Sequence, residues 1–426
     1  MRTLPGILIL MLLSSLTSAE ETVKGSVLKK GHRVAIVGDS ITEQKLYSKF
    51  IETYLTVCLS DLDLHVIQLG WSGETAPGFL GRMNNDLLPW KPDVVTTCYG
   101  MNDGSYRAYD ESIGKRYAGA MADIVGRLKK AGATVVVGGP GAVDSDYFNK
   151  AKPEGTKPQV YNNNLLQLSG LAKKLAEAEG FPHADVFGAM MSAQEKAKAA
   201  FGQNYDVCGK DGVHPGPNGH LLMAYAFLKG MGIDGQIGSI TVDLKGKAAS
   251  SEGHKIVAEE TGKIELESSR YPFCFIGDEK SSSGTKSILP FIPFNADLNR
   301  LTLVVKNLDG AAAKVTWGAA SKSFSKEELE KGINLAAEFP DNNPFVESFR
   351  KVEALVGAKQ NFETGMIKNM ITTFPRTVDS MAKDKAVEAS IEGLRKQLFE
   401  VQEKMDASVR TAVRPVKHTI TVAADK

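Results

Sequence analysis

Short apolar runs alternate with amphipathic segments through the first half of the chain, and this alternation limits the possible folds more than any other feature. Strands that alternate with helices predict a parallel sheet with helices on both faces. The expected class over about residues 33–232 is therefore α/β, with a last helix after Pro217. The strand-like runs are 34–37, 65–69, 94–99, 134–138 and 184–186, and the helix-like segments are 46–58, 79–88, 117–130 and 160–179.

The sequence texture changes after Ile233. Residues 233–320 read as antiparallel strands separated by turns, with a polar loop at 280–287. One helix is expected at 326–339, with Ser325 as its N-cap, and two longer helices are expected within 343–413. Residues 416–423 read as a closing strand. We therefore divide the mature chain into a domain at 20–232 and a C-terminal accessory region at 233–426, with helices over 326–413.

The second long helix carries an apolar seam at alternating spacings of four and three residues. This pattern favours an antiparallel hairpin packed on its own domain over a coiled coil. We expect the accessory region to pack against the first domain, because no long linker occurs near Gly232. Glycan binding and self-association remain open as its role, and the sequence leaves the oligomeric state open. The seam consists of Val387, Ile391, Leu394, Leu398, Val401 and Met405.

The N-terminus has the pattern of a secretory signal peptide at 1–19. Arg2 precedes an apolar run, and Thr17 and Ala19 form a small-residue cleavage site. The apolar run is short for a transmembrane helix, although an uncleaved anchor is the alternative. We expect a secreted or periplasmic protein with no stable membrane insertion after cleavage. Export permits disulfides, but the sequence does not decide whether Cys58, Cys98, Cys208 and Cys274 pair.

Charge gives no reason to expect nucleic acid as a partner. The chain has 51 Lys and Arg residues against 50 Asp and Glu residues, a formal net charge of +1. No basic tract stands out, so the electrostatic footprint of a nucleic-acid-binding protein is missing from the sequence.

Four polar stretches follow strands or precede the last helix of the predicted sheet. They are Gly38-Asp39-Ser40, "GWSGET" at 70–75, "YGMND" at 99–103 and "DGVHPGPNGH" at 211–220. In an open α/β sheet, ligands bind at the carboxyl ends of the strands. We therefore expect these four stretches to converge on one site.

Their residue types suit ester hydrolysis by a serine. Ser40 is the candidate nucleophile, His214 the base that takes its proton, and Asp211 the group that orients the imidazole. The candidate oxyanion donors are the backbone N–H groups of Ser40 and Gly73 and the side-chain amide of Asn102. Glycine at 73 lets the backbone approach a substrate closely.

These residues give the chain a family resemblance. "GDS", "SGET", "GMND" and "DGVH" resemble, in order, the four blocks of SGNH hydrolases, the GDSL-type esterases. The resemblance implies a flavodoxin-like three-layer α/β/α sandwich, and it implies the roles given above for Ser40, Gly73, Asn102, Asp211 and His214. It implies neither a metal nor a cofactor. Gln68-Leu69 departs from the small polar residue that many members have before the second block.

Other readings of the same stretches are weaker. Ser72 lacks the final glycine of a nucleophile elbow. Asp39 and Asp103 suit hydrogen bonding within turns. Trp71 suits either stacking on a sugar or covering the end of the sheet. The other histidines lack an Asp at turn spacing in such a loop: His32, His65, His183, His220, His254 and His418.

Together these features predict a secreted serine esterase acting on short acyl esters, acetyl esters first, of a carbohydrate. A lysophospholipase or an arylesterase of the same fold is the alternative within the enzyme class. A non-catalytic carbohydrate-binding protein is the alternative outside it, and hydrolysis of a generic acetyl ester would separate the two. The acyl group and the alcohol part of the substrate stay open.

Overall fold

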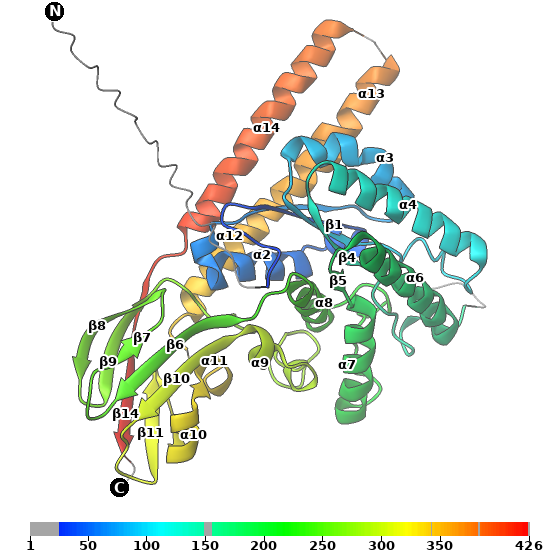
Figure 1. Cartoon of the computed structure of the whole chain (residues 1–426). Helices are drawn as coiled ribbons and strands as arrows, with labels where there is room; N and C mark the ends of the chain where they lie inside the picture. The colour runs from blue at the N-terminus through cyan, green and yellow to red at the C-terminus, as the bar shows by residue number, and fades with distance from the viewer. Residues whose placement is uncertain (1–24, 149–155, 342, 382–383, 425–426) are drawn as a thin grey trace, which may run out of the picture.

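A computed structural model gives the fold of residues 25–148, 156–341, 343–381 and 384–424. At its centre lies a five-stranded, fully parallel sheet with the strand order β2-β1-β3-β4-β5. This is the order of flavodoxin-like doubly wound folds, so the predicted class is confirmed (Figure 1). The strands are β1 (Arg33–Gly38), β2 (His65–Gly70), β3 (Val94–Cys98), β4 (Thr134–Gly138) and β5 (His183–Ala184).

Side chains of the central strands alternate between two apolar layers. In β1, Val34 and Ile36 belong to one core cluster, whereas Ala35 and Val37 belong to the other. Because both faces of the sheet are buried, both sets of alternating side chains are apolar, and the strands read as continuous apolar runs. The first face is covered by α2 (Tyr47–Cys58) and α8 (Pro217–Gly230), and the second by α3 (Ala76–Asp86), α4 (Glu111–Lys130) and most of α6 (Pro158–Glu179) (Figure 1).

The fifth strand is shorter than the sequence predicted. It ends at Ala184, and Val186 instead opens a helix, α7 (Val186–Phe201), that the pattern did not reveal. Asp185 caps this helix by accepting a hydrogen bond from the Gly188 amide. A short apolar run is compatible with a buried strand or a buried helix, and the cap decides between them.

The C-terminal region forms two further sheets. One has the order β13-β10-β6-β7 and the other β12-β11-β14-β9-β8. The closing strand β14 lies in the middle of the second sheet, between β9 and β11. The strands are β6 (Gln236–Asp243), β7 (Ala249–Ser250), β8 (His254–Glu260), β9 (Lys263–Ser268), β10 (Arg300–Lys306), β11 (Ala312–Trp317), β12 (Ala320–Ser325), β13 (Ile333–Asn334) and β14 (Val416–Ala424).

Two expectations about these strands were wrong. β6 pairs with β10 in parallel, not antiparallel. The long connection between them, which includes β7 to β9, makes a parallel crossover possible, and parallel strands require such a connection. Residues 271–277 around Cys274 read as strand-like in the sequence, but they form an irregular stretch in which the Phe273 amide and carbonyl bond to the Asn299 side chain.

The helix expected at 326–339 is broken in two. α10 (Lys326–Lys331) has Ser325 as its N-cap, as predicted, and the Ser325 side chain also forms a capping box with Glu328. Gly332 then has a φ of 103° and ends the helix. The chain forms the short strand β13 before α11 (Leu335–Glu338). A left-handed backbone at glycine is a common way to stop a helix.

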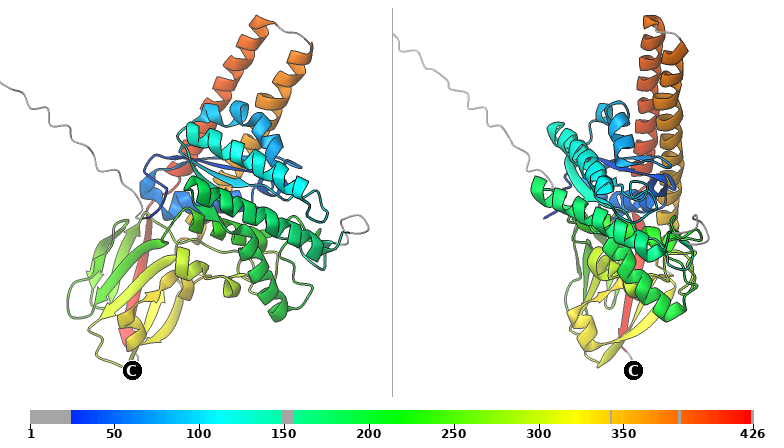
Figure 2. Two further views of the ribbon diagram at one scale, coloured as in Figure 1. Left: turned by 45° about the vertical axis from the view of Figure 1, so that its right-hand side comes forward. Right: turned by 90° about the vertical axis from the view of Figure 1, so that its right-hand side faces the viewer.

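The last helices form a hairpin that extends beyond the central sheet, away from the β region (Figures 1 and 2). Its first arm is α12 (Val346–Gly365), a π-helical turn η4 (Met366–Thr373) and α13 (Phe374–Met381). Its second arm is α14 (Lys385–Thr411). The predicted seam is only half-buried, and its Val401 is 40% exposed. The buried positions of α14 are instead Gln402, Asp406 and Val409. Two of them are polar and have buried partners: Gln402 bonds to Glu363, and Asp406 lies near Lys359.

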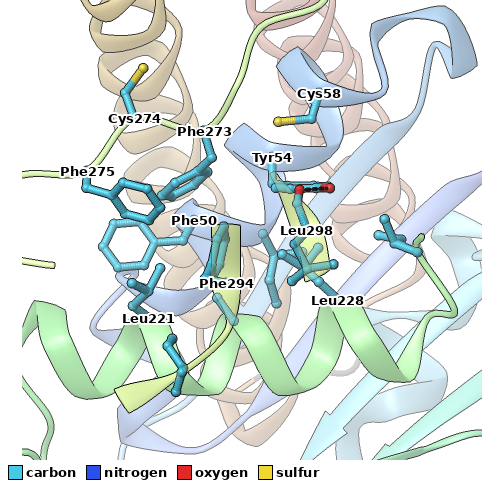
Figure 3. Packing of buried hydrophobic residues seen from close by; sticks show 14 of the residues in the cluster. Phe50, Tyr54, Cys58, Leu221, Leu228, Phe273, Cys274, Phe275, Phe294 and Leu298 are labelled. Atoms are coloured by element: carbon cyan, nitrogen blue, oxygen red, sulfur yellow. Dashed lines mark hydrogen bonds between the residues drawn. The ribbon is translucent and has the colours of Figure 1, made fainter. Parts of the chain in front are cut away.

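The α/β domain and the C-terminal region share one continuous apolar core. Phe50 and Tyr54 of α2 pack against Phe273 and Phe294 of the C-terminal region, at ring-centroid separations of 6.1 to 6.5 Å (Figure 3). The Tyr54 hydroxyl donates a hydrogen bond to the Leu298 carbonyl at 2.6 Å. This aromatic contact buries a face of α2 that would otherwise meet water.

Two of the predicted features concern membranes and export. The predicted signal peptide at 1–19 lies outside the described residues. Among the helices that the structure does describe, none combines the length and the apolar character needed to cross a bilayer. All four cysteines are described, and each is a buried free thiol.

Candidate active site

The four polar stretches meet at the carboxyl edge of the central sheet. Ser40 starts the short helix α1 (Ser40–Glu43) directly after β1, and Asp39 caps it by accepting from the Ile41 amide at 3.0 Å. Gly38 has no room for a side chain, because a Cβ there would overlap the Thr42 side chain and the Cys98 carbonyl. The tight strand-to-helix turn therefore raises Ser40 to the rim, where it is half-buried.

Ser40, His214 and Asp211 form a continuous chain of hydrogen bonds. Ser40 Oγ lies 2.8 Å from His214 Nε2, and His214 Nδ1 lies 2.6 Å from Asp211 Oδ2. The other carboxylate oxygen of Asp211 accepts from the backbone amides of Val213 and His214, at 2.9 and 2.8 Å. The loop is thus folded so that one aspartate holds both the backbone and the ring of the histidine.

The Asp211 carboxylate is stabilised in its charged form. Partial burial alone would raise its pKa, but hydrogen bonds from the His214 ring and from the two amides lower the pKa to about 2. Asp211 therefore remains an anion at neutral pH. Because the Asp211 carboxylate accepts a hydrogen bond from Nδ1, a neutral His214 ring keeps its proton on Nδ1, and Nε2 can accept a proton from Ser40.

The three candidate oxyanion donors follow the carboxyl ends of β1, β2 and β3. Gly73 has a φ of 73°, and a Cβ there would meet no atom within 4 Å, so glycine is needed for the backbone angle rather than for space. Within the described part of the chain, the amides of Ser40 and Gly73 donate to no protein acceptor. Asn102 Nδ2 donates one of its two protons to the Glu74 carbonyl at 3.0 Å, which leaves the other for a ligand.

Two supports of this arrangement were not predicted from the sequence. Directly after Gly73, Glu74 accepts two hydrogen bonds of 2.6 Å from Arg82, a side chain only 3% exposed. Tyr99 also donates to Glu74 at 2.8 Å. A buried bidentate ion pair has a well-defined geometry, so the Arg82–Glu74 pair holds the backbone next to Gly73 in place.

The second support is Tyr106, whose hydroxyl donates to Asn102 Oδ1 at 3.3 Å. Ser105 and Tyr106 both have left-handed backbones, with φ of 56° and 51°. Such angles are uncommon for residues other than glycine and occur often at functional sites. No sequence motif marks this pair of residues.

The aspartates beside the site have structural contacts. Asp39 caps α1, and burial raises its pKa to about 7. Asp103 accepts from the Ala76 amide at 3.0 Å, which joins the third stretch to the second, and burial raises its pKa to about 6. Asp39 thus bonds within its own turn, whereas Asp103 bonds between two loops.

The alternative nucleophile and bases lie elsewhere or are engaged. Ser72 is exposed, and its amide donates to the Glu43 carboxylate. His220 is fully buried, accepts from the Tyr47 amide at 3.1 Å, and has a pKa lowered by burial to about 3.

A buried serine of the β region also contacts two histidines. Ser268 Oγ lies 2.8 Å from both His254 Nδ1 and His418 Nε2. Ser268 is 0% exposed, and Trp317 Nε1 donates to the other nitrogen of His418 at 3.1 Å. Because no substrate can reach a fully buried hydroxyl, we assign this chain of contacts to packing within the second C-terminal sheet.

The C-terminal hairpin reaches the rim of the site, which the sequence did not indicate. Trp71 lies beneath two cations, Arg82 Cζ at 4.9 Å and Lys368 Nζ at 5.2 Å from the ring centroid. A cavity of about 280 Å³ opens beside Gly73, and Arg376 of α13 is one of its lining residues. Trp71 therefore lies between the sheet end and the hairpin.

Comparison with known proteins gives three similarities. A sequence model of the GDSL-like lipase/acylhydrolase family matches residues 36–222. An acetylxylan esterase from Geobacillus stearothermophilus is 23% identical over 226 residues, which are 48% of this chain and 95% of that protein. The solved structure of a gut microbial diltiazem-metabolizing enzyme is 19% identical with a TM-score of 0.71, over 93% of this chain and 98% of that one. That last likeness shows a shared fold that includes the C-terminal region.

Proposed function

We propose that this chain, a carboxylic ester hydrolase with a domain of the GDSL-like lipase/acylhydrolase family at residues 36–222, cleaves short acyl esters with Ser40, His214 and Asp211. The observation that carries this proposal is the chain of contacts from Ser40 Oγ through the His214 ring to Asp211, at 2.8 and 2.6 Å. No other described residues combine an accessible serine with such a pair.

The reaction follows from the positions of these groups. Ser40 Oγ attacks the ester carbonyl while His214 Nε2 takes its proton, and the carbonyl π electrons move to the oxygen. The oxyanion is stabilised by the Ser40 and Gly73 amides and by Asn102. As the carbon–oxygen bond to the alcohol breaks, His214 returns the proton to the departing alkoxide. Water then attacks the acyl-Ser40 ester by the same route and releases the acid.

We further propose that the natural substrate is an acetylated carbohydrate. The support is the similarity to an acetylxylan esterase over 226 residues and the export predicted from residues 1–19. On this proposal the chain is secreted or periplasmic, residues 20–232 carry the chemistry, and residues 233–426 are an accessory region.

The test is a screen of acetate release from acetylated xylan and other acetylated polysaccharides, with lysophospholipids and aryl acetates as competing classes. We expect release from acetylated polysaccharide, and none from a folded Ser40→Ala variant. Release from lipids alone would refute the carbohydrate substrate. Glycan binding without hydrolysis of any ester would refute the catalytic proposal and favour a binding protein.

A further inference from the structure

The π-helical turn η4 of the C-terminal region touches the loop that carries Gly73. Lys368, inside this turn, places Nζ 2.7 Å from Glu43 Oε1. Glu43 lies three residues after Ser40 in α1, and its other oxygen accepts the amide of Ser72, the neighbour of Gly73. One carboxylate therefore joins the C-terminal hairpin to the backbone of the proposed oxyanion loop.

The ion pair is more enclosed than an ordinary surface pair. The side chains of Lys368 and Glu43 are only 24% and 19% exposed. Partial burial would raise the pKa of Glu43, but the hydrogen bonds from Lys368 and Ser72 outweigh it and lower the pKa. The charged carboxylate is thus the form that holds the loop. Lys368 also lies over the Trp71 ring, one residue before Ser72.

A second contact connects the same turn to the other end of the loop. Thr372 Oγ1 donates to Asp86 Oδ1 at 2.7 Å, and Asp86 Oδ2 accepts from Arg82 at 3.0 Å. Arg82 is the partner of Glu74, directly after Gly73. The turn therefore contacts the supports on both sides of Gly73.

The π-helical geometry has a local cause in the sequence. Pro375 has no amide proton, so it cannot bond to the Ile371 carbonyl four residues earlier. That carbonyl instead accepts from Asn85 Nδ2 at 3.2 Å, and the Phe374 amide bonds five residues back to Asn369. π-Helical turns are rare and often lie at functional sites. Here the wider turn carries Lys368 and Thr372 to the loop.

We infer that Lys368 is a positioning residue for ester hydrolysis: through Glu43 and the Ser72 amide it fixes the backbone from which Gly73 donates to the oxyanion. This inference rests on the proposed function, because it concerns the geometry of the same site. The accessory region then supplies part of the active-site scaffold. Without the Lys368 cation, Glu43 loses its ion pair and is held less firmly as the acceptor of the Ser72 amide. The loop that carries Gly73 then becomes more mobile.

Kinetics on an aryl acetate test the inference in the full chain. We expect Lys368→Met to lower kcat about 10- to 100-fold, the effect of a displaced catalytic donor, with KM changed less than about twofold. Lys368→Arg keeps a cation and should restore most of kcat. Glu43→Gln should resemble Lys368→Met, and the double variant should be no slower than the slower single variant, because both act through one contact.

Lys351→Met is the matched control. Lys351 belongs to the same helical arm but is 71% exposed, in a pair with Glu347. We expect its kcat and melting temperature to equal those of the wild type. A Lys368→Met kcat within about twofold of wild type, or a loss that Lys368→Arg does not reverse, would overturn the inference.

Hydrogen exchange of the peptide that spans 70–76 gives a readout independent of turnover. Lys368→Met should speed exchange in this peptide, whereas Lys351→Met should not. If the wild type hydrolyses no ester, the proposed function fails while the exchange result still reports on the contact. Unchanged exchange would refute the role of Lys368 whatever the activity.

Discussion

Replacing Lys359 should destabilise the protein more than replacing any exposed lysine of the same helix. Lys359 lies in α12 with a side chain that is 0% exposed. Its Nζ lies 2.8 Å from Glu52 Oε1, 2.7 Å from Glu363 Oε1 and 2.7 Å from the Val66 carbonyl. Glu52 belongs to α2 and Val66 to β2, so one ammonium group joins the α/β domain to the C-terminal hairpin.

The size of the effect follows from the charges that remain. Removing one partner of a buried ion pair typically costs about 3–5 kcal/mol. Burial raises the pKa of Glu52 to about 7 even with Lys359 present, and it raises the pKa of Glu363 as well. Without the cation both carboxyls hold protons more strongly in the folded than in the unfolded chain. A carboxyl whose pKa is raised in the folded chain loses its contribution to stability as pH rises through that folded pKa. The loss of stability in Lys359→Met should therefore grow as pH rises from 6 to 8.

Urea unfolding followed by circular dichroism, at pH 6 and pH 8, measures this free energy. Lys351→Met is the control, and we expect it to change stability by less than about 0.5 kcal/mol. Adding Glu52→Gln and Glu363→Gln to Lys359→Met should recover at least half of the loss, because it removes the unpaired charges. A loss below about 1 kcal/mol in Lys359→Met, or a triple variant less stable than the single one, would refute the reasoning.

Four further outcomes are expected. Ser40→Ala should lower kcat at least about 10³-fold in a folded protein, and a variant that keeps most activity on aryl acetates would remove Ser40 from the mechanism. Asp211→Asn should lower kcat/KM about 10²- to 10⁴-fold and should move the acidic limb of the kcat/KM pH profile to lower pH. The reason is that the interaction which lowers the pKa of Asp211 to about 2 also favours protonated His214. An unmoved limb would argue against that pairing. Burial lowers the pKa of His418 to about 3, so its contribution to stability is complete above the unfolded value of about 6.5 and is lost as pH falls toward 3; melting curves should show this fall, and His418→Gln, which cannot titrate, should reduce it. A chain that ends at Gly232 should be insoluble or much less stable, because it exposes the aromatic face of α2, and equal solubility and melting temperature would contradict that.

The α/β domain was predictable because its signals are local. Strands buried on both faces must be apolar throughout, and the site residues follow them at fixed positions in the sequence. Asp211 and His214 are three residues apart in one turn, so their pairing could be read from the sequence before the contact at 2.6 Å was known. The break at Val186 was missed because the cap by Asp185, not the apolar pattern, decides where the helix begins.

The contribution of the hairpin to the site could not be predicted. Glu43 and Lys368 are 325 residues apart, and no periodicity distinguishes this lysine from the exposed ones. The buried side of α14 was misread for a related reason. Its inward positions include Gln402 and Asp406, which reach Glu363, Lys359 and His65. Apolar periodicity alone assigns such polar residues to solvent.

The position of β14 has a consequence for how the chain is made. β14 pairs with β9 on one side and β11 on the other, yet it is the last described strand to leave the ribosome. Until then β9 and β11 have no common neighbour, and the hairpin helices that brace the Gly73 loop have only just emerged. This second C-terminal sheet therefore cannot be completed until translation is nearly finished. For the export proposed above, the delay would keep this sheet incomplete while the chain is threaded through a translocation channel.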